Sequence, residues 1–114
     1  MKKKILVIFG TRPEAIKIFP VIKDLKINKN LFNTKVCITD QHTDLLEPIL
    51  NFFKIKADYS LNIMKKNQEL FYITSKILNN IQNVLKKFNP DYVIVHGDTT
   101  TTLASSMACF YNNN

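Results

Sequence analysis

The sequence predicts an α/β fold in which helices cover both faces of a parallel sheet. Two observations support this prediction. Short apolar runs rich in β-branched residues alternate with segments whose apolar residues recur at three- and four-residue spacing, the patterns of buried strands and amphipathic helices. The loops between them are short, as in strand–helix units joined by right-handed crossovers. With 114 residues, the chain has the length of one domain, and no linker or repeat divides it.

Four strands are expected, of which the first and the last are the most apolar. Residues 5–9 and 92–96 are continuous apolar runs, which is the pattern of strands buried on both faces of a sheet. A second strand is expected over residues 35–39 and a short third strand over residues 59–63. In the common strand order 3-2-1-4 of doubly wound sheets, the first and fourth strands are neighbours.

Four helices are expected between and after these strands, the last over residues 100–111. The first follows Pro13, which suits the first turn of a helix, and Pro20 is expected to kink or shorten it. The third has the clearest stripe, with Asn67 placed as its cap and Asn89 beginning the segment that ends it. The stripes are Ala15, Ile18, Phe19, Ile22 and Leu25, then Leu45, Leu46, Ile49, Leu50 and Phe53, then Leu70, Ile73, Ile77, Ile81, Val84, Leu85 and Phe88.

Composition excludes several classes of protein. At 46% hydrophobic and 22% charged residues the chain is globular, and no apolar run approaches the roughly 18 residues that cross a membrane. The lysines behind the net charge of +7 are spread among isoleucines and asparagines, so we expect no nucleic-acid binding. The N-terminal apolar run is too short for a secretory signal, which predicts a cytoplasmic protein. Cys37 and Cys109 are interpreted as buried, reduced thiols.

Residues suited to ligand binding follow the first and fourth strands. The chain has two glycines, Gly10 and Gly97, and each comes directly after one of these strands. Ligands of doubly wound sheets bind outside the carboxyl ends of the strands, so we expect both glycine loops to face one crevice. Neither loop has the spacing of a dinucleotide fingerprint or of a P-loop, which argues against an NAD or ATP site.

Arg12 is the single arginine among sixteen basic residues. Its planar, permanently charged fork suits phosphate and carboxylate groups. At the N-terminus of the first helix it would help to hold an anion, together with the helix dipole and free N–H groups. The alternative is that Arg12 and Glu14 form a surface ion pair while Gly10 merely turns the chain.

Asp98 also has two interpretations. Before a helix it would be an ordinary N-cap, a role for which residues 99–102 also offer hydroxyl groups. Beside an anion-binding crevice, its carboxylate would act as a general base or stabilise a developing cation. His96 would then orient Asp98, or else pack as an ordinary residue at a strand end. Gln41 and His42 form a further polar pair at the same edge of the sheet.

Four segments together resemble the non-hydrolysing UDP-N-acetylglucosamine 2-epimerases of bacteria, and they follow the whole chain in order. They are residues 9–17 (FGTRPEAIK), 39–42 (TDQH), 58–64 (DYSLNIM) and 95–104 (VHGDTTTTLA). The resemblance implies a GT-B architecture, in which the substrate lies between two Rossmann-like halves. Residues 1–114 would form an incomplete N-terminal domain, and the C-terminal domain would be absent.

The resemblance also implies an activity and roles for particular residues. The family interconverts UDP-GlcNAc and UDP-ManNAc for surface polysaccharides, by eliminating UDP and adding it back after inversion at C2, without a cofactor or a metal. Gly10, Arg12, Lys17 and Asp98 would bind the substrate. Asp98 would also be a catalytic carboxylate, while cationic groups would stabilise the departing diphosphate.

Some members of the family have a regulatory UDP-GlcNAc site, whose glutamine–histidine pair is matched by Gln41 and His42. Asp44 and Asn67 differ from the glutamine and arginine of regulated members, which argues against activation here. Full-length members are expected to be homodimers, a companion chain could supply the missing half, and the 114-residue chain alone is expected to be inactive. The alternatives are a hydrolysing epimerase, another GT-B nucleotide-sugar enzyme, or a non-catalytic nucleotide-sugar-binding remnant.

Overall fold

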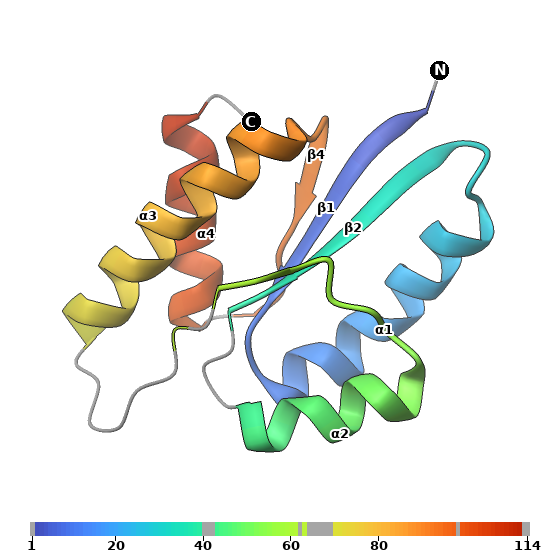
Figure 1. Ribbon diagram of the computed structural model, residues 1–114, viewed down its shortest axis with the longest axis horizontal. Helices are drawn as coiled ribbons and strands as arrows, with labels where there is room; N and C mark the ends of the chain where they lie inside the picture. Colours follow the sequence, from blue (N-terminus) through green and yellow to red (C-terminus); the bar gives the residue numbers. More distant parts are fainter. Residues whose placement is uncertain (1, 40–42, 62, 64–69, 98, 113–114) are drawn as a thin grey trace.

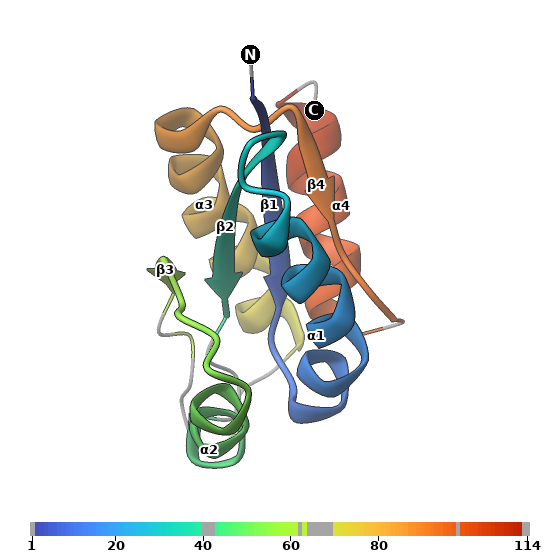
Figure 2. The ribbon, with the colours of Figure 1, turned by 90° about the vertical axis from the view of Figure 1, so that its right-hand side faces the viewer.

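A computed structural model of the chain describes residues 2–39, 43–61, 63, 70–97 and 99–112. Four parallel strands form one sheet in the order β3-β2-β1-β4, so β1 and β4 are neighbours, as predicted. Helices α1 and α2 cover one face of the sheet, and α3 and α4 cover the other (Figures 1 and 2). The elements are β1 Lys3–Phe9, α1 Arg12–Ile27, β2 Phe32–Ile38, α2 Thr43–Phe53, β3 Tyr59–Ser60, α3 Leu70–Phe88, β4 Tyr92–Ile94 and α4 Thr100–Tyr111.

The central strand β1 is buried on both faces, and its side chains alternate between two cores. Every residue from Ile5 to Phe9 is at most 4% exposed. Leu6 and Ile8 pack toward α3 and α4, whereas Val7 and Phe9 pack toward α1 and α2. A strand without a polar face is what a continuous apolar run predicts. The first core also contains Cys37, Ile77, Ile81, Leu85 and Ala104, and the second contains Ile18, Ile22, Val36, Leu46 and Leu50.

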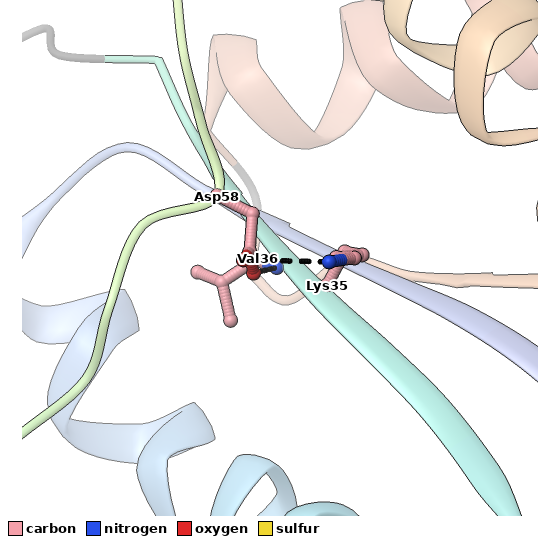
Figure 3. A network of polar contacts seen from close by, with 3 residues as sticks. All are labelled: Lys35, Val36 and Asp58. Atoms are coloured by element: carbon pink, nitrogen blue, oxygen red, sulfur yellow. Dashed lines mark hydrogen bonds and ion pairs between the residues drawn. The ribbon is translucent and has the colours of Figure 1, made fainter.

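An aspartate precedes each outer strand and pairs with the neighbouring inner strand. Asp58, just before β3, accepts a hydrogen bond from the Val36 amide of β2 at 2.8 Å, and its other carboxylate oxygen lies 3.9 Å from the Lys35 ammonium (Figure 3). Asp91, just before β4, accepts from the Lys4 amide of β1 at 2.8 Å, and its own amide donates to the Lys4 carbonyl. Both aspartates therefore hold the short outer strands in register.

Strand β4 is shorter than the sequence predicts. It ends at Ile94 instead of residue 96. The His96 carbonyl accepts a hydrogen bond from the Thr102 hydroxyl at 2.7 Å, so it is directed at α4 and not at the β1 ladder. The strand is shorter because the chain turns toward the start of α4 after Ile94.

Strand β3 covers only two residues of the predicted range 59–63. Its hydrogen bonds to β2 nevertheless continue on both sides, because the amides of Asp58 and Leu61 donate to the carbonyls of Val36 and Ile38. The two donors, Asp58 and Leu61, are three residues apart, whereas the two acceptors on β2 are two residues apart. This mismatch of one residue, as in a bulge, interrupts the regular ladder.

Pro20 does not end α1, because the helix continues seven residues beyond it to Ile27. A proline removes one hydrogen bond from a helix interior. Ile18 and Ile22, on either side of Pro20, are buried against the sheet, and this packing holds the helix together. Within the described residues, no helix combines the length and the apolar character that a bilayer span needs.

Helix α3 forms where it was predicted, with one difference in its apolar stripe. Leu70 is 69% exposed, so the packed stripe begins at Ile73. Asn89 follows the helix in a left-handed conformation with a φ of 52°, which asparagine tolerates at helix ends. The predicted cap Asn67 lies outside the described residues.

The two cysteines are buried and neither forms a disulfide, which confirms their interpretation as reduced thiols. Burial raises the pKa of the Cys109 thiol above its ordinary value, so the neutral thiol is the form present at neutral pH.

Candidate active site at the two glycine loops

The two glycine loops meet at the carboxyl ends of β1 and β4. Gly10 follows β1 and is buried, and Gly97 follows shortly after β4, the strand that pairs with β1. Arg12, the first residue of α1, and Lys17, in the second turn, are both exposed. The predicted site residues that lie outside the described part of the chain are Gln41, His42 and Asp98.

Glu14, which the sequence offered only as a surface partner of Arg12, joins the two loops. The residue is buried, with 4% of its surface exposed. One carboxylate oxygen accepts hydrogen bonds from the amides of Gly10 at 2.9 Å and Thr11 at 3.1 Å. The other accepts from the Thr99 hydroxyl at 2.6 Å. The alternative of a surface ion pair is therefore wrong.

The Glu14 carboxylate lies between the N-termini of two helices. Thr11 is the N-cap of α1 and forms a capping box with Glu14, in which each side chain accepts a hydrogen bond from the other residue's amide. Thr99 is the N-cap of α4, and its hydroxyl also accepts from the Thr102 amide at 3.4 Å. The positive ends of two helix dipoles thus face one carboxylate, which offsets the cost of burying its charge.

These internal bonds use most of the backbone donors that an anion at α1 would otherwise take. The Gly10 and Thr11 amides bond to Glu14, and the Glu14 and Ala15 amides bond to Thr11. Proline, the residue after Arg12, has no N–H. Within the described part of the chain, Arg12 therefore has the one uncommitted amide of residues 10–15. The free N–H groups expected of this helix are largely occupied, so attraction for an anion depends on the Arg12 side chain.

Thr99 is the N-cap of α4, so the N-cap role that the sequence allowed for Asp98 belongs to Thr99. On the other side of Asp98, Gly97 has a φ of 92°, which side chains rarely adopt. A Cβ atom at Gly97 would lie 3.5 Å from Oε2 of Glu14, an ordinary contact. Conformation rather than space therefore requires glycine here.

Buried polar groups continue beneath the loops. The hydroxyls of Thr39, after β2, and Thr101, in α4, lie 3.2 Å apart, and both residues are fully buried. Nδ1 of His96 is also buried and has no hydrogen-bond partner among the described residues. Such a group costs about 1–3 kcal/mol when it stays unpaired.

The sequence contained a local signal for Glu14 and none for its partner across the sheet. Threonine followed three residues later by glutamate is the pattern of a capping box, and it predicts the bonds between Thr11 and Glu14. The bond from Thr99 joins residues 85 positions apart, which no local pattern predicts. The described residues contain no group of three histidine, cysteine, aspartate or glutamate side chains placed to hold a metal.

Comparisons with known proteins show which proteins the chain is similar to. A family profile described as UDP-N-acetylglucosamine 2-epimerase matches residues 24–113. The chain is 55% identical over 111 residues to the UDP-N-acetylglucosamine 2-epimerase of Campylobacter jejuni. The matched residues cover 97% of this chain and 29% of the relative.

Two solved structures are similar to the chain over nearly its full length. The UDP-GlcNAc 2-epimerase from Neisseria meningitidis bound to UDP-GlcNAc superposes with a TM-score of 0.91 at 55% identity, covering 96% of this chain and 29% of that chain. The enzyme from Methanocaldococcus jannaschii in complex with UDP-GlcNAc and UDP gives a TM-score of 0.87 at 33% identity, covering 96% and 30%. The chain therefore spans less than a third of the length of these relatives.

Proposed function

Because the chain belongs to the UDP-N-acetylglucosamine 2-epimerase family, we propose that it forms the N-terminal half of a site that interconverts UDP-GlcNAc and UDP-ManNAc. UDP leaves C1 as the proton leaves C2, which gives a 2-acetamidoglucal, and UDP then adds back to C1 while a proton is delivered to the opposite face of C2, without net hydrolysis. The other half of the cleft would come from the part of the relatives that this chain does not cover, or from a companion chain. The proposed location is the cytoplasm.

The observation that supports this proposal is the pair of glycine loops held together at the carboxyl ends of β1 and β4, with Arg12 exposed beside them. Arg12 and Lys17 would hold the diphosphate of the nucleotide sugar and stabilise its charge as it departs. Asp98, between the two residues that lie against Glu14, would act on the C2 proton or stabilise the positive charge that develops on the sugar ring.

The local electrostatics favour a dominant role for Arg12 in binding. Glu14 already accepts bonds from the loop amides and places a negative charge under the site. An incoming diphosphate thus has few free amides and a buried carboxylate nearby. Its attraction must come from cationic side chains, of which Arg12 stands closest to the glycine loop in the sequence and offers two parallel donors.

Replacement of Arg12 by alanine is expected to weaken UDP and UDP-GlcNAc binding by one to two orders of magnitude. A hydrogen bond to a charged partner contributes about 1.5–3 kcal/mol, and about 1.4 kcal/mol corresponds to a tenfold change. Isothermal titration calorimetry of the 114-residue chain with each ligand measures the effect. Arg12→Lys, which keeps the charge and loses the fork, is expected to fall between the wild type and Arg12→Ala.

Lys23→Ala is the matched control for this titration, since it removes one exposed positive charge from the same helix about 16 Å farther along its axis. Its affinity for UDP is expected to stay close to that of the wild type. Equal losses of UDP affinity in Arg12→Ala and Lys23→Ala would mean that Arg12 acts only through the overall charge of the chain. Failure of the wild-type chain to bind either ligand at millimolar concentration would contradict the proposed function.

A further inference from the structure

We infer that Glu14 is a positioning residue, which holds the segment carrying Asp98 against the loop carrying Arg12. This inference rests on the proposed function for the role of Asp98, but the contact itself is a property of the fold. An ordinary capping box needs only the bonds between Thr11 and Glu14. Here the same carboxylate is buried and also bonds to Gly10 and Thr99.

Glu14 lies beside both neighbours of Asp98 in the sequence and bonds to one of them, Thr99. The Thr99 hydroxyl donates to Oε2 of Glu14 at 2.6 Å, and Gly97 lies so close that a Cβ atom on it would be 3.5 Å from the same oxygen. The left-handed backbone of Gly97 and the N-cap of Thr99 fix the chain on either side. A shift of Glu14 would therefore disturb Thr99, the residue directly after the proposed catalytic carboxylate.

The charge on Glu14 makes the contact directional. A carboxylate accepts and does not donate, so Thr99 must point its proton at Glu14 while its oxygen accepts from the Thr102 amide. This arrangement uses the single proton of the Thr99 hydroxyl. A residue at position 99 that caps α4 equally well but brings a second carboxylate would keep the helix and repel Glu14.

Thr99→Asp tests this directly, because aspartate is a strong N-cap and cannot donate to Glu14 when ionised. The Gly10 and Thr11 amides are expected to exchange with solvent deuterium about tenfold faster than in the wild type, which is within the range of coupling between residues in contact. The Thr102 amide keeps its protection, since the cap remains. Amide exchange measured by NMR at neutral pH reports each position separately.

Glu14→Gln supplies the compensating change. Its side-chain oxygen keeps the bonds from Gly10 and Thr11, and its NH2 group can donate to an aspartate at position 99. The double variant Glu14→Gln/Thr99→Asp has the same net charge as the wild type. Its loop amides are expected to return to within about threefold of wild-type exchange rates.

Three results would overturn the inference. The first is unchanged exchange at Gly10 and Thr11 in Thr99→Asp, and the second is equally fast exchange in the double variant. Faster exchange throughout β1 and β2 would indicate general destabilisation rather than loss of this contact, and it would also contradict a positioning role. The exchange rates are measured without ligand, so they decide the inference even if the wild-type chain binds no nucleotide and the proposed function fails.

Discussion

Phe9→Ala is expected to lower the free energy of unfolding by about 3–5 kcal/mol, the usual cost of removing a buried phenylalanine side chain. Phe9 is the last residue of the central strand, is fully buried, and packs among the residues of α1 and α2 just before the Gly10 loop. A small domain has about 5–15 kcal/mol of stability in total. The variant is therefore expected to be largely unfolded at modest urea concentrations where the wild type is folded.

Phe71→Ala is the matched control, because Phe71 is 88% exposed on α3. Its stability is expected to stay within about 0.5 kcal/mol of the wild type, as for most surface substitutions. Urea unfolding followed by circular dichroism measures both variants. A loss below about 1 kcal/mol for Phe9→Ala would mean that β1 is not the buried centre of the sheet.

Asp98→Asn is expected to lower the rate of epimerisation by about 10²–10⁴-fold, the usual contribution of a general acid or base. The assay uses a chimaera in which this chain replaces the matching N-terminal part of the Neisseria meningitidis relative, to which it is 55% identical. Formation of UDP-ManNAc from UDP-GlcNAc is followed by NMR. Binding of UDP to the variant is expected to change little, because the cationic side chains that hold the diphosphate are unaltered.

Asp24→Asn in the same chimaera is the control, since Asp24 is an exposed aspartate on α1. It is expected to retain the activity of the unmodified chimaera. An Asp98→Asn chimaera with full activity would exclude a catalytic role for this carboxylate. Release of free ManNAc and UDP, in place of UDP-ManNAc, would contradict the non-hydrolysing reaction and favour the hydrolysing alternative.

The fold could be predicted from the sequence because its signals are local and agree with one another. The apolar run of β1 reports burial on both faces, and the regular stripe of α3 reports a helix packed along one side. The strand order was predicted from the order that is common in doubly wound sheets, and no particular residue indicated it. The length of β4 was not predicted, because the Thr102 hydroxyl donates a hydrogen bond to the His96 carbonyl and a strand pattern does not reveal such a bond.

The sequence predicted which loops form the candidate site, but it did not predict the hydrogen bonds that join them. The positions of the two glycines after β1 and β4 predicted that their loops meet at one edge of the sheet, and the structure confirms this meeting. The burial of Glu14 could not be predicted, because the sequence offered this residue only as a surface partner of Arg12. Its burial depends on Thr99, which reaches it only when two parallel strands bring distant loops together. Contacts of this kind are set by topology and not by local pattern.

The proposed function requires that a nucleotide sugar binds where the two glycine loops meet. Because Gly10 and Gly97 are the chain's only glycines, their amide signals can be recognised in a ¹⁵N–¹H correlation spectrum by glycine-selective labelling alone. On titration with UDP-GlcNAc, both signals are expected to shift in the wild type, and neither is expected to shift over the same range in Arg12→Ala. Binding that moves other signals and leaves both glycines unchanged would place the ligand elsewhere and contradict the claim.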